Sequence, residues 1–122
     1  MRHHNKNKKF GRQKSARAAL IHSLVVALIT HGKITTTEAR ARALRPTIEK
    51  LVTRAKKGAP SDVRLIKSRL ANNLAITNTL VKEIAPKFAA RKGGYTRITK
   101  LGNRSGAGDA SPLATIEFIN EK

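Results

Sequence analysis

The first acidic residue of the chain is Glu38, and the segment before it is strongly basic. No side chain in that segment can neutralise its Lys and Arg residues. Like charges at this density repel one another, so folding alone gives no reason to collect them, whereas a large polyanion does. We therefore expect this segment to bind a polyanion. Its eight basic residues are Arg2, Lys6, Lys8, Lys9, Arg12, Lys14, Arg17 and Lys33.

The beginning of this segment, residues 1–14, cannot contribute a core. Apart from Met1, its only large apolar residue is Phe10, and the others are Lys, Arg, His, Asn, Gln and Gly. Such a composition buries too little apolar surface to offset the entropy lost on ordering. We predict a basic N-terminal arm over residues 1–14, disordered in isolation, and a single α/β globular domain over residues 15–122.

The charge of the whole chain narrows the kinds of partner. Its 26 Lys and Arg residues against 7 Asp and Glu residues give a net charge of +19, which favours nucleic acid or an anionic membrane. The longest apolar run, residues 24–29, is far shorter than the roughly 20 residues that span a bilayer. No apolar segment of a secretory leader follows the basic start. The absence of Cys excludes disulfides and thiolate zinc sites.

The first predicted helix carries the most apolar sequence of the chain. Ser15 is a suitable N-cap, and apolar residues recur at helical spacing from Leu20 to Ile29. Gly32 suits the left-handed position that ends a helix. We expect this helix to be central to the core.

A second helix is predicted after a short extended segment, residues 33–35. Thr35 and Glu38 have the spacing of a capping box, which indicates a helix over residues 36–57. Pro46 lies inside that span. It either kinks one long helix or begins another helix.

Two shorter helices and two strands are predicted in the remaining sequence. Apolar spacing indicates helices over residues 61–71 and 74–90. Residues 95–101 and 113–119 have the composition of strands, and the Gly-rich residues 102–112 between them indicate a long loop. The two strands are expected to pair as a hairpin.

The histidines and acidic residues do not form a catalytic or metal site. His3 and His4 are adjacent on the arm, and His22 and His31 are nine residues apart, whereas two helical ligands need a spacing of about three or four. We expect both helical histidines at the surface. The acidic residues are dispersed, so a two-carboxylate hydrolytic site is not indicated. The sequence predicts no enzyme activity, no cofactor and no small-molecule substrate.

A second basic region covers residues 87–104, which include six Lys or Arg residues and no acid. Within it, Gly93 and Gly94 follow two basic residues, where backbone N–H groups can approach a phosphate. The same glycines also suit a plain linker between helix and strand. Basic residues on a strand can serve only to protect a sheet edge. The coincidence with the basic arm favours binding.

The scarcity of aromatic residues limits how nucleic acid could be recognised. Modules that bind single strands stack bases on several aromatic rings, and this chain has three Phe and one Tyr. Contacts are therefore expected mainly to phosphate and sugar, and neutralising ~8 phosphates gives a log–log salt slope of roughly −6 to −7. The predicted RNA-binding residues are Arg2, His3, Lys6, Lys8, Lys9, Arg12, Lys14, Arg17, Arg91, Lys92, Tyr95, Arg97, Lys100 and Arg104.

Short segments spread in order along the chain carry a resemblance to a known family. They are residues 1–3, 10–12, 35–39, 44–51, 84–86, 91–98 and 108–114. Together they resemble bacterial large-subunit ribosomal protein seventeen, and the region from Ile84 to Ile98 is the most specific part. No single segment would suffice, but their order over essentially the whole chain is specific.

The resemblance implies a fold and a set of partners. It implies an α+β fold, a two-layer α/β arrangement of about four helices on a small, mainly antiparallel sheet, in the order helix, strand, three helices, two strands. It also implies a structural component of the cytoplasmic large ribosomal subunit that binds ribosomal RNA through its arm. Neighbouring ribosomal proteins, including large-subunit protein thirty-two, are expected contacts, and neither catalysis nor a membrane is implied.

Two other classes of function remain alternatives. A free, DNA-architectural protein would favour a dimer, an apolar wedge or a recognition helix with base-reading side chains. The densest basic clusters here lie instead on the predicted arm and loop. An enzyme acting on RNA would need an acid/base constellation, and the sequence offers none.

Overall fold

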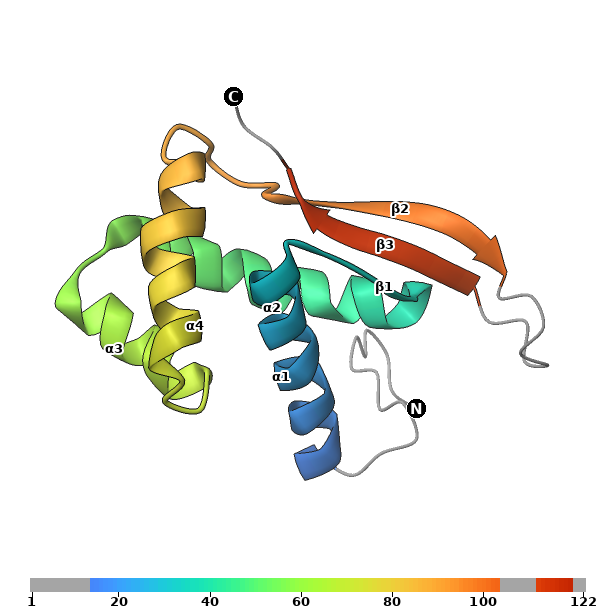
Figure 1. The fold of residues 1–122 in the computed structure, drawn as a ribbon, viewed down its shortest axis with the longest axis horizontal. Coiled ribbons are helices and arrows are strands. Elements are labelled where there is room, and N and C mark those ends of the chain that lie inside the picture. The colour runs from blue at the N-terminus through green and yellow to red at the C-terminus, as the bar shows by residue number, and fades with distance from the viewer. Residues whose placement is uncertain (1–13, 104–111, 120–122) are drawn as a thin grey trace, which may run out of the picture.

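The computed structural model describes residues 14–103 and 112–119, and the predicted arm lies outside these residues except for Lys14. Helices and strands follow one another in the order that the resemblance implied, so the α+β prediction is confirmed (Figure 1). A short π-helical turn and a 3-10 turn, η1 and η2, continue the fourth helix. The elements are α1 Lys14–His31, β1 Lys33–Thr37, α2 Glu38–Lys57, α3 Pro60–Arg69, α4 Leu74–Asn78, η1 Thr79–Ile84, η2 Ala85–Phe88, β2 Thr96–Asn103 and β3 Pro112–Phe118.

The three strands form one antiparallel sheet in the order β1-β3-β2. The predicted hairpin of β2 and β3 is confirmed. β3 is also paired with β1, with Ile34 opposite Ile116, although three helices separate the two strands along the chain. The central strand is therefore the last one in the sequence.

The helix α2 packs on one face of the sheet and forms the centre of the core (Figure 1). Its buried residues recur every three or four positions, so they lie along one side of the helix. Ile116 of β3 and Leu28 of α1 are completely buried with them. The buried side of α2 consists of Ala41, Leu44, Ile48, Leu51, Val52 and Ala55.

The first helix ends as its sequence predicts. Gly32 adopts a φ of +76°, in the left-handed region that glycine enters without a steric penalty. Its N–H donates to the carbonyl of Leu28 at 2.7 Å, which closes the helix end. The chain then turns directly into β1.

The start of the second helix differs from the prediction. The N-cap is Thr37, whose side chain accepts a hydrogen bond from the N–H of Arg40 at 3.3 Å. Thr35 instead lies in β1, where its hydroxyl is 3.3 Å from that of Thr115. Pro46 lies within the uninterrupted α2, so it does not begin another helix.

The strand β2 extends further than the prediction, which placed residue 102 in a loop. Lys100 pairs with Ala114, but the next pair joins Gly102 to Leu113, so Leu101 is an extra residue. Gly102 has a φ of +89°, and this irregularity carries the strand on to Asn103. The extra residue bends the strand where it approaches its outer end.

Candidate nucleic-acid interface

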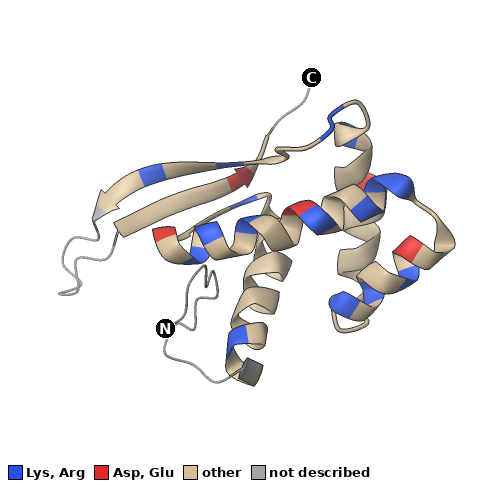
Figure 2. Cartoon of the chain, turned by 180° about the vertical axis from the view of Figure 1, so that it is seen from behind, with Lys and Arg blue, Asp and Glu red and all other residues tan. Residues whose placement is uncertain are grey.

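Lys and Arg residues occur on several elements of the molecule (Figure 2). The helices α2 and α3, the strand β2 and the turn that leads into β2 all carry them. Acidic residues are interspersed but fewer. The cations therefore come from several elements, and the strands contribute only part of them.

Two of the predicted RNA-binding residues lie on β2 and are exposed. Arg97 is 3.4 Å from Glu117 on the neighbouring strand, and its side chain is 59% exposed. Lys100 is 3.6 Å from Glu38 at the start of α2, and its side chain is 67% exposed. Exposed pairs of this kind contribute little to stability. They hold the cations in place while leaving them accessible.

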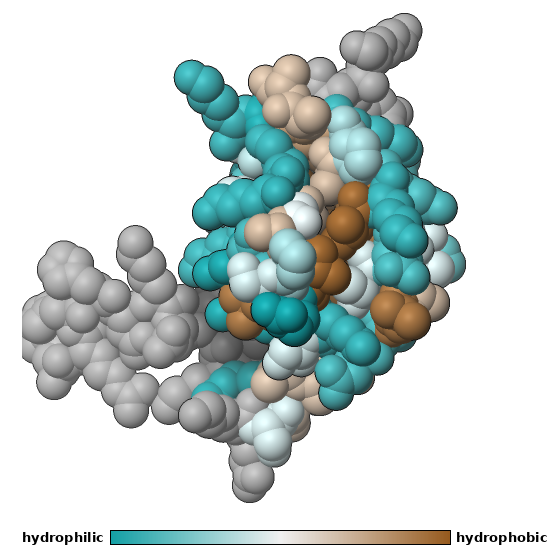
Figure 3. Space-filling view, turned by 90° about the vertical axis from the view of Figure 1, so that its left-hand side faces the viewer, coloured by the Kyte–Doolittle hydropathy of each residue, from teal (hydrophilic) through white to brown (hydrophobic). Residues whose placement is uncertain are grey.

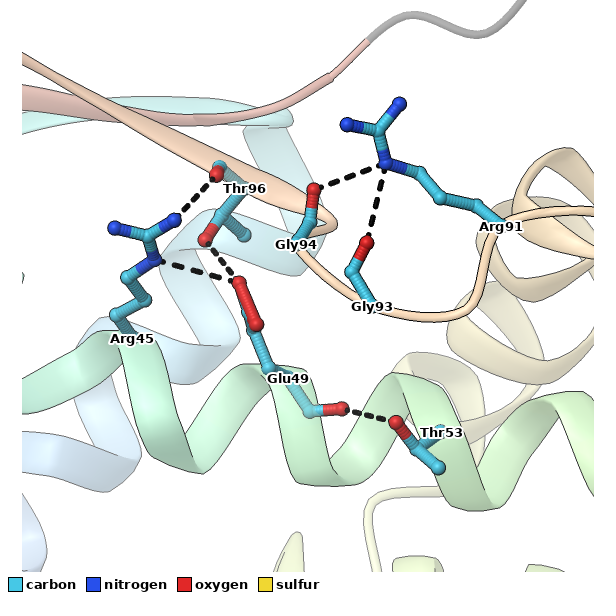
Figure 4. Close-up of polar contacts among 7 residues, drawn as sticks. All are labelled: Arg45, Glu49, Thr53, Arg91, Gly93, Gly94 and Thr96. Atoms are coloured by element: carbon cyan, nitrogen blue, oxygen red, sulfur yellow. Dashed lines mark hydrogen bonds and ion pairs between the residues drawn. The ribbon is translucent and has the colours of Figure 1, made fainter.

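The turn before β2 is folded around a basic side chain (Figure 4). The Nε of Arg91 donates to the carbonyls of Gly93 at 3.2 Å and Gly94 at 3.1 Å. Gly94 has a φ of +64°, and Lys92 is exposed. The turn therefore has a defined backbone and presents a cation, which is compatible with both the linker and the phosphate-contact interpretation.

Tyr95 was predicted among the RNA-binding residues, but the structure places it in the core. Its side chain is 1% exposed, and its ring centroid lies 5.3 Å from that of Phe88. A base cannot stack on this buried ring. Burial of the side chain contradicts the prediction that Tyr95 contacts RNA.

The hydroxyl of Tyr95 connects α2 to the turn. It accepts hydrogen bonds from Thr53 at 3.3 Å and Lys56 at 3.1 Å, and it donates to the carbonyl of Lys92 at 3.3 Å. Lys56 also donates to the carbonyl of Arg91 and lies over the ring. Burial raises the pKa of Tyr95, but the hydrogen bonds from Thr53 and Lys56 and the charge of Lys56 outweigh it, so the pKa is lower than usual.

A second polar network attaches the first residue of β2 to α2 (Figure 4). The hydroxyl of Thr96 donates to Glu49 at 3.1 Å, and Arg45 lies 3.4 Å from the same carboxylate. Arg45 also donates to the Thr96 carbonyl at 3.4 Å. Thr96 is buried, so these bonds satisfy its polar groups. The start of the basic strand is thereby fixed to the helical layer.

Most of the predicted RNA-binding residues near the N-terminus, and Arg104, lie outside the described residues. Lys14 and Arg17 are the two exceptions. Lys14 begins α1, and Arg17 follows one turn later on the same helix, where it is partly buried. The arm and the hairpin loop therefore stay predictions. Those outside are Arg2, His3, Lys6, Lys8, Lys9, Arg12 and Arg104.

Sequence reasoning missed the cations of α2 and α3. Lys50, Lys57 and Arg69 are exposed, and no ion pair joins them to another described residue. They line one hollow together with residues of α1. A charged outer face is ordinary for an amphipathic helix, so no sequence pattern indicates that these residues share a surface.

The two histidines of α1 differ in their exposure to solvent. His31 is exposed, as predicted, whereas His22 is partly buried and its Nε2 has no hydrogen-bond partner. Among residues 14–103 and 112–119, no cluster of His, Asp and Glu could hold a metal ion. No helix within these residues is both long enough and apolar enough to cross a membrane.

The face that carries α3 and α4 has a mixed surface (Figure 3). The side that carries α3 and α4 is largely hydrophilic, with a narrow strip of hydrophobic atoms between polar walls (Figure 3). Among the described residues, the large hydrophobic side chains most exposed are Leu74, 57%, and Leu101, 54%. They belong to different elements, α4 and β2. Charge, rather than a broad apolar patch, is therefore the dominant surface feature.

Comparison with known proteins identifies the family. The family described as Ribosomal protein L17 matches residues 20–119. Large ribosomal subunit protein bL17 of Persephonella marina is 52% identical over 119 residues, covering 98% of this chain and 95% of the relative. The proteins of that name from Campylobacter hominis and Neorickettsia sennetsu are 49% and 47% identical, and each is covered over 100% of its length. The chain belongs to the ribosomal protein L17 family.

Proposed function

We propose that this chain is a structural component of the large ribosomal subunit that binds ribosomal RNA through phosphate contacts. Its family is one of structural constituents of the ribosome and not of enzymes. The proposal assigns the cytoplasmic ribosome as its place of action. It also includes neighbouring ribosomal proteins as partners, among them large-subunit protein thirty-two.

The observation that carries the RNA-binding proposal is the set of exposed cations on the turn and on both faces of β2. Lys92, Arg97 and Lys100 are exposed on elements that hydrogen bonds attach to α2. Cations on a rigid support suit a phosphate backbone, because little side-chain and backbone freedom remains to be lost on binding. In the proposal the arm, residues 1–14, adds its six Lys and Arg residues.

The DNA-architectural alternative is disfavoured by the same arrangement. Its characteristic features are a helix that inserts into a groove or an apolar wedge between base steps. The helix α1, which is the most apolar, contributes Val25, Leu28 and Ile29 to the core. The cations are spread over the outer surface of a compact support.

Sedimentation of a cell lysate tests the function. At physiological salt we expect the chain to migrate with large ribosomal subunits, and raising the salt should release it because phosphate contacts are screened. A chain found mainly with the nucleoid, or free in the supernatant at physiological salt, would contradict the proposal.

Deletion of residues 1–14 tests the division into arm and domain. We expect the shortened chain to keep a cooperative thermal transition but to bind large-subunit RNA much more weakly. A matched deletion of residues 104–111, with the strands rejoined by a short Gly-containing turn, separates the arm from the hairpin loop. Loss of folding after removal of residues 1–14 would show that this segment belongs to the core.

A further inference from the structure

A hollow lies where α1, α2 and α3 meet, and Gly93 and Tyr95 of the turn before β2 also line it. It has a volume of about 820 Å³ and opens to solvent between the first half of α1, the outer face of α2 and the end of α3. Sites for small molecules and short polymer segments fall in this size range, about 300–1,000 Å³. We call it the α1–α2–α3 groove.

The chemistry of the groove combines an apolar floor with a basic rim. Leu51 and Leu70 are buried at its base, with relative exposures of 4% and 1%. Lys50, Lys57 and Arg69 line it and are exposed, without an ion pair to any described residue. Three cations left unneutralised around one hollow repel one another, so an anionic occupant relieves that repulsion.

The acidic residue within the groove does not cancel this charge. Glu49 is directed toward Arg45 and Thr96 on the sheet side, where its carboxylate is hydrogen-bonded. Arg54, another lining residue, is paired with Asp62 at 3.1 Å. The rim therefore remains basic where Lys50 and Lys57 project.

The wall formed by α1 has an unusual feature. His22 lines the groove, and its Nε2 is buried without a hydrogen-bond partner. A buried polar atom without a partner is destabilising. The Nε2 atom itself is not accessible, so the groove offers a partner for it only after the ring rotates. The α1 wall of the groove therefore contains a polar atom whose hydrogen bonding is unsatisfied.

We propose that the α1–α2–α3 groove is a second RNA-binding site, which holds a short segment of sugar–phosphate backbone. The phosphates would lie against Lys50, Lys57 and Arg69, and a ribose against the apolar floor. This inference rests on the proposed function, and it adds a contact surface on α2 and α3 that the arm and hairpin do not include. RNA is favoured over an acidic peptide because the rim cations are spread around the hollow, and a backbone with one charge at each nucleotide can meet them in turn.

A pair of matched double variants tests the proposal on the full chain. Lys50→Gln with Lys57→Gln removes two rim cations, and Arg64→Gln with Lys82→Gln removes two exposed cations of α3 and η1 that do not line the groove. The two variants have the same net charge. Binding to large-subunit ribosomal RNA is measured as a function of salt concentration.

The expected result is a difference in slope between the two variants. Loss of two phosphate contacts should make the log–log salt slope shallower by about 1.4–1.8 for the groove variant. The control variant should keep the slope of the unmodified chain. Equal slopes for the groove variant and the control would overturn the proposal, whereas failure of the unmodified chain to bind the RNA at all would overturn the proposed function itself.

A photoreactive residue in place of Thr47, which lines the groove, identifies the occupant in assembled subunits. An adduct with ribosomal RNA supports the proposal. An adduct with a protein, or no adduct, overturns it. The same residue in place of Lys82 serves as the control position.

Discussion

The hydroxyl of Tyr95 offers the sharpest test of how the basic turn is held. Tyr95→Phe removes one oxygen and keeps the ring in contact with Phe88. Three hydrogen bonds disappear, two that the hydroxyl accepts from Thr53 and Lys56 and one that it donates to the Lys92 carbonyl. The substitution therefore separates the polar function of the residue from its packing.

The magnitude follows from the groups that lose a partner. Leaving a buried polar group unsatisfied costs about 1–3 kcal/mol, and more when the group is charged. Lys56 keeps its hydrogen bond to the carbonyl of Arg91, which limits the loss of stability. For a domain of this size 1 kcal/mol corresponds to about 4 °C, so the melting temperature should fall by about 4–12 °C.

Thermal unfolding followed by circular dichroism measures this change. Ser68→Ala, on an exposed position of α3, is a suitable control, because surface substitutions usually change stability by less than about 0.5 kcal/mol. At a temperature where both variants are folded, Tyr95→Phe should also bind RNA more weakly, because the turn carrying Lys92 is less well fixed. A melting temperature equal to that of the control would refute the role of the hydroxyl.

Three further predictions address the same structure. Tyr95 is the only Tyr and there is no Trp, so the absorbance titration reports on this residue alone. Its pKa should be lower in the folded chain than in urea, and the free energy of unfolding should rise with pH between those two pKa values. Lys56→Met should raise the pKa of Tyr95 in the folded chain. Thr37→Ala should cost about 1 kcal/mol in urea unfolding, because it removes the cap of α2, and an unchanged midpoint would contradict that role. Ile48→Ala should cost about 2–5 kcal/mol, because the side chain is completely buried, and a loss below 1 kcal/mol would show a looser core.

The helices could be predicted because each buries one face, and burial leaves a local period in the sequence. The spacing from Leu44 to Val52 indicates the buried face of α2 without any knowledge of what covers it. The end of α1 was equally predictable, since Gly32 has a conformational reason to stand there. These features depend on residues within a few positions of each other.

The features that could not be predicted depend on partners far along the chain. Thr35, Thr36 and Thr37 are equivalent candidates for the cap of α2. Pairing with β3 extends β1 through all three, so the helix begins only after Thr37, which caps it. The position of β3 between its two neighbours has the same origin. Strand order is set by packing of the whole sheet, which local composition does not encode.

The exposure of side chains in the candidate interface could not be predicted either, because it also depends on partners far along the chain. Basic neighbours suggested that Tyr95 lies at the surface, but its ring is needed beside Phe88 and its hydroxyl beside Lys56. Conversely, Lys50 and Arg69 resemble ordinary exposed residues in sequence. Only the meeting of three helices shows that they line one hollow.

Four acidic residues of the described part of the chain lie where basic elements meet. Three of these acids pair with a cation of a neighbouring element, and the fourth pairs with a cation of its own helix, α2. Glu38 pairs with Lys100 of β2, Asp62 of α3 with Arg54 of α2, and Glu117 of β3 with Arg97 of β2, while Glu49 meets both Arg45 and Thr96. The acids are thus placed at the joints between elements, where repulsion between cations would otherwise oppose packing. The cations of the α1–α2–α3 groove lie beyond these joints, and their repulsion is left for a bound polyanion to neutralise.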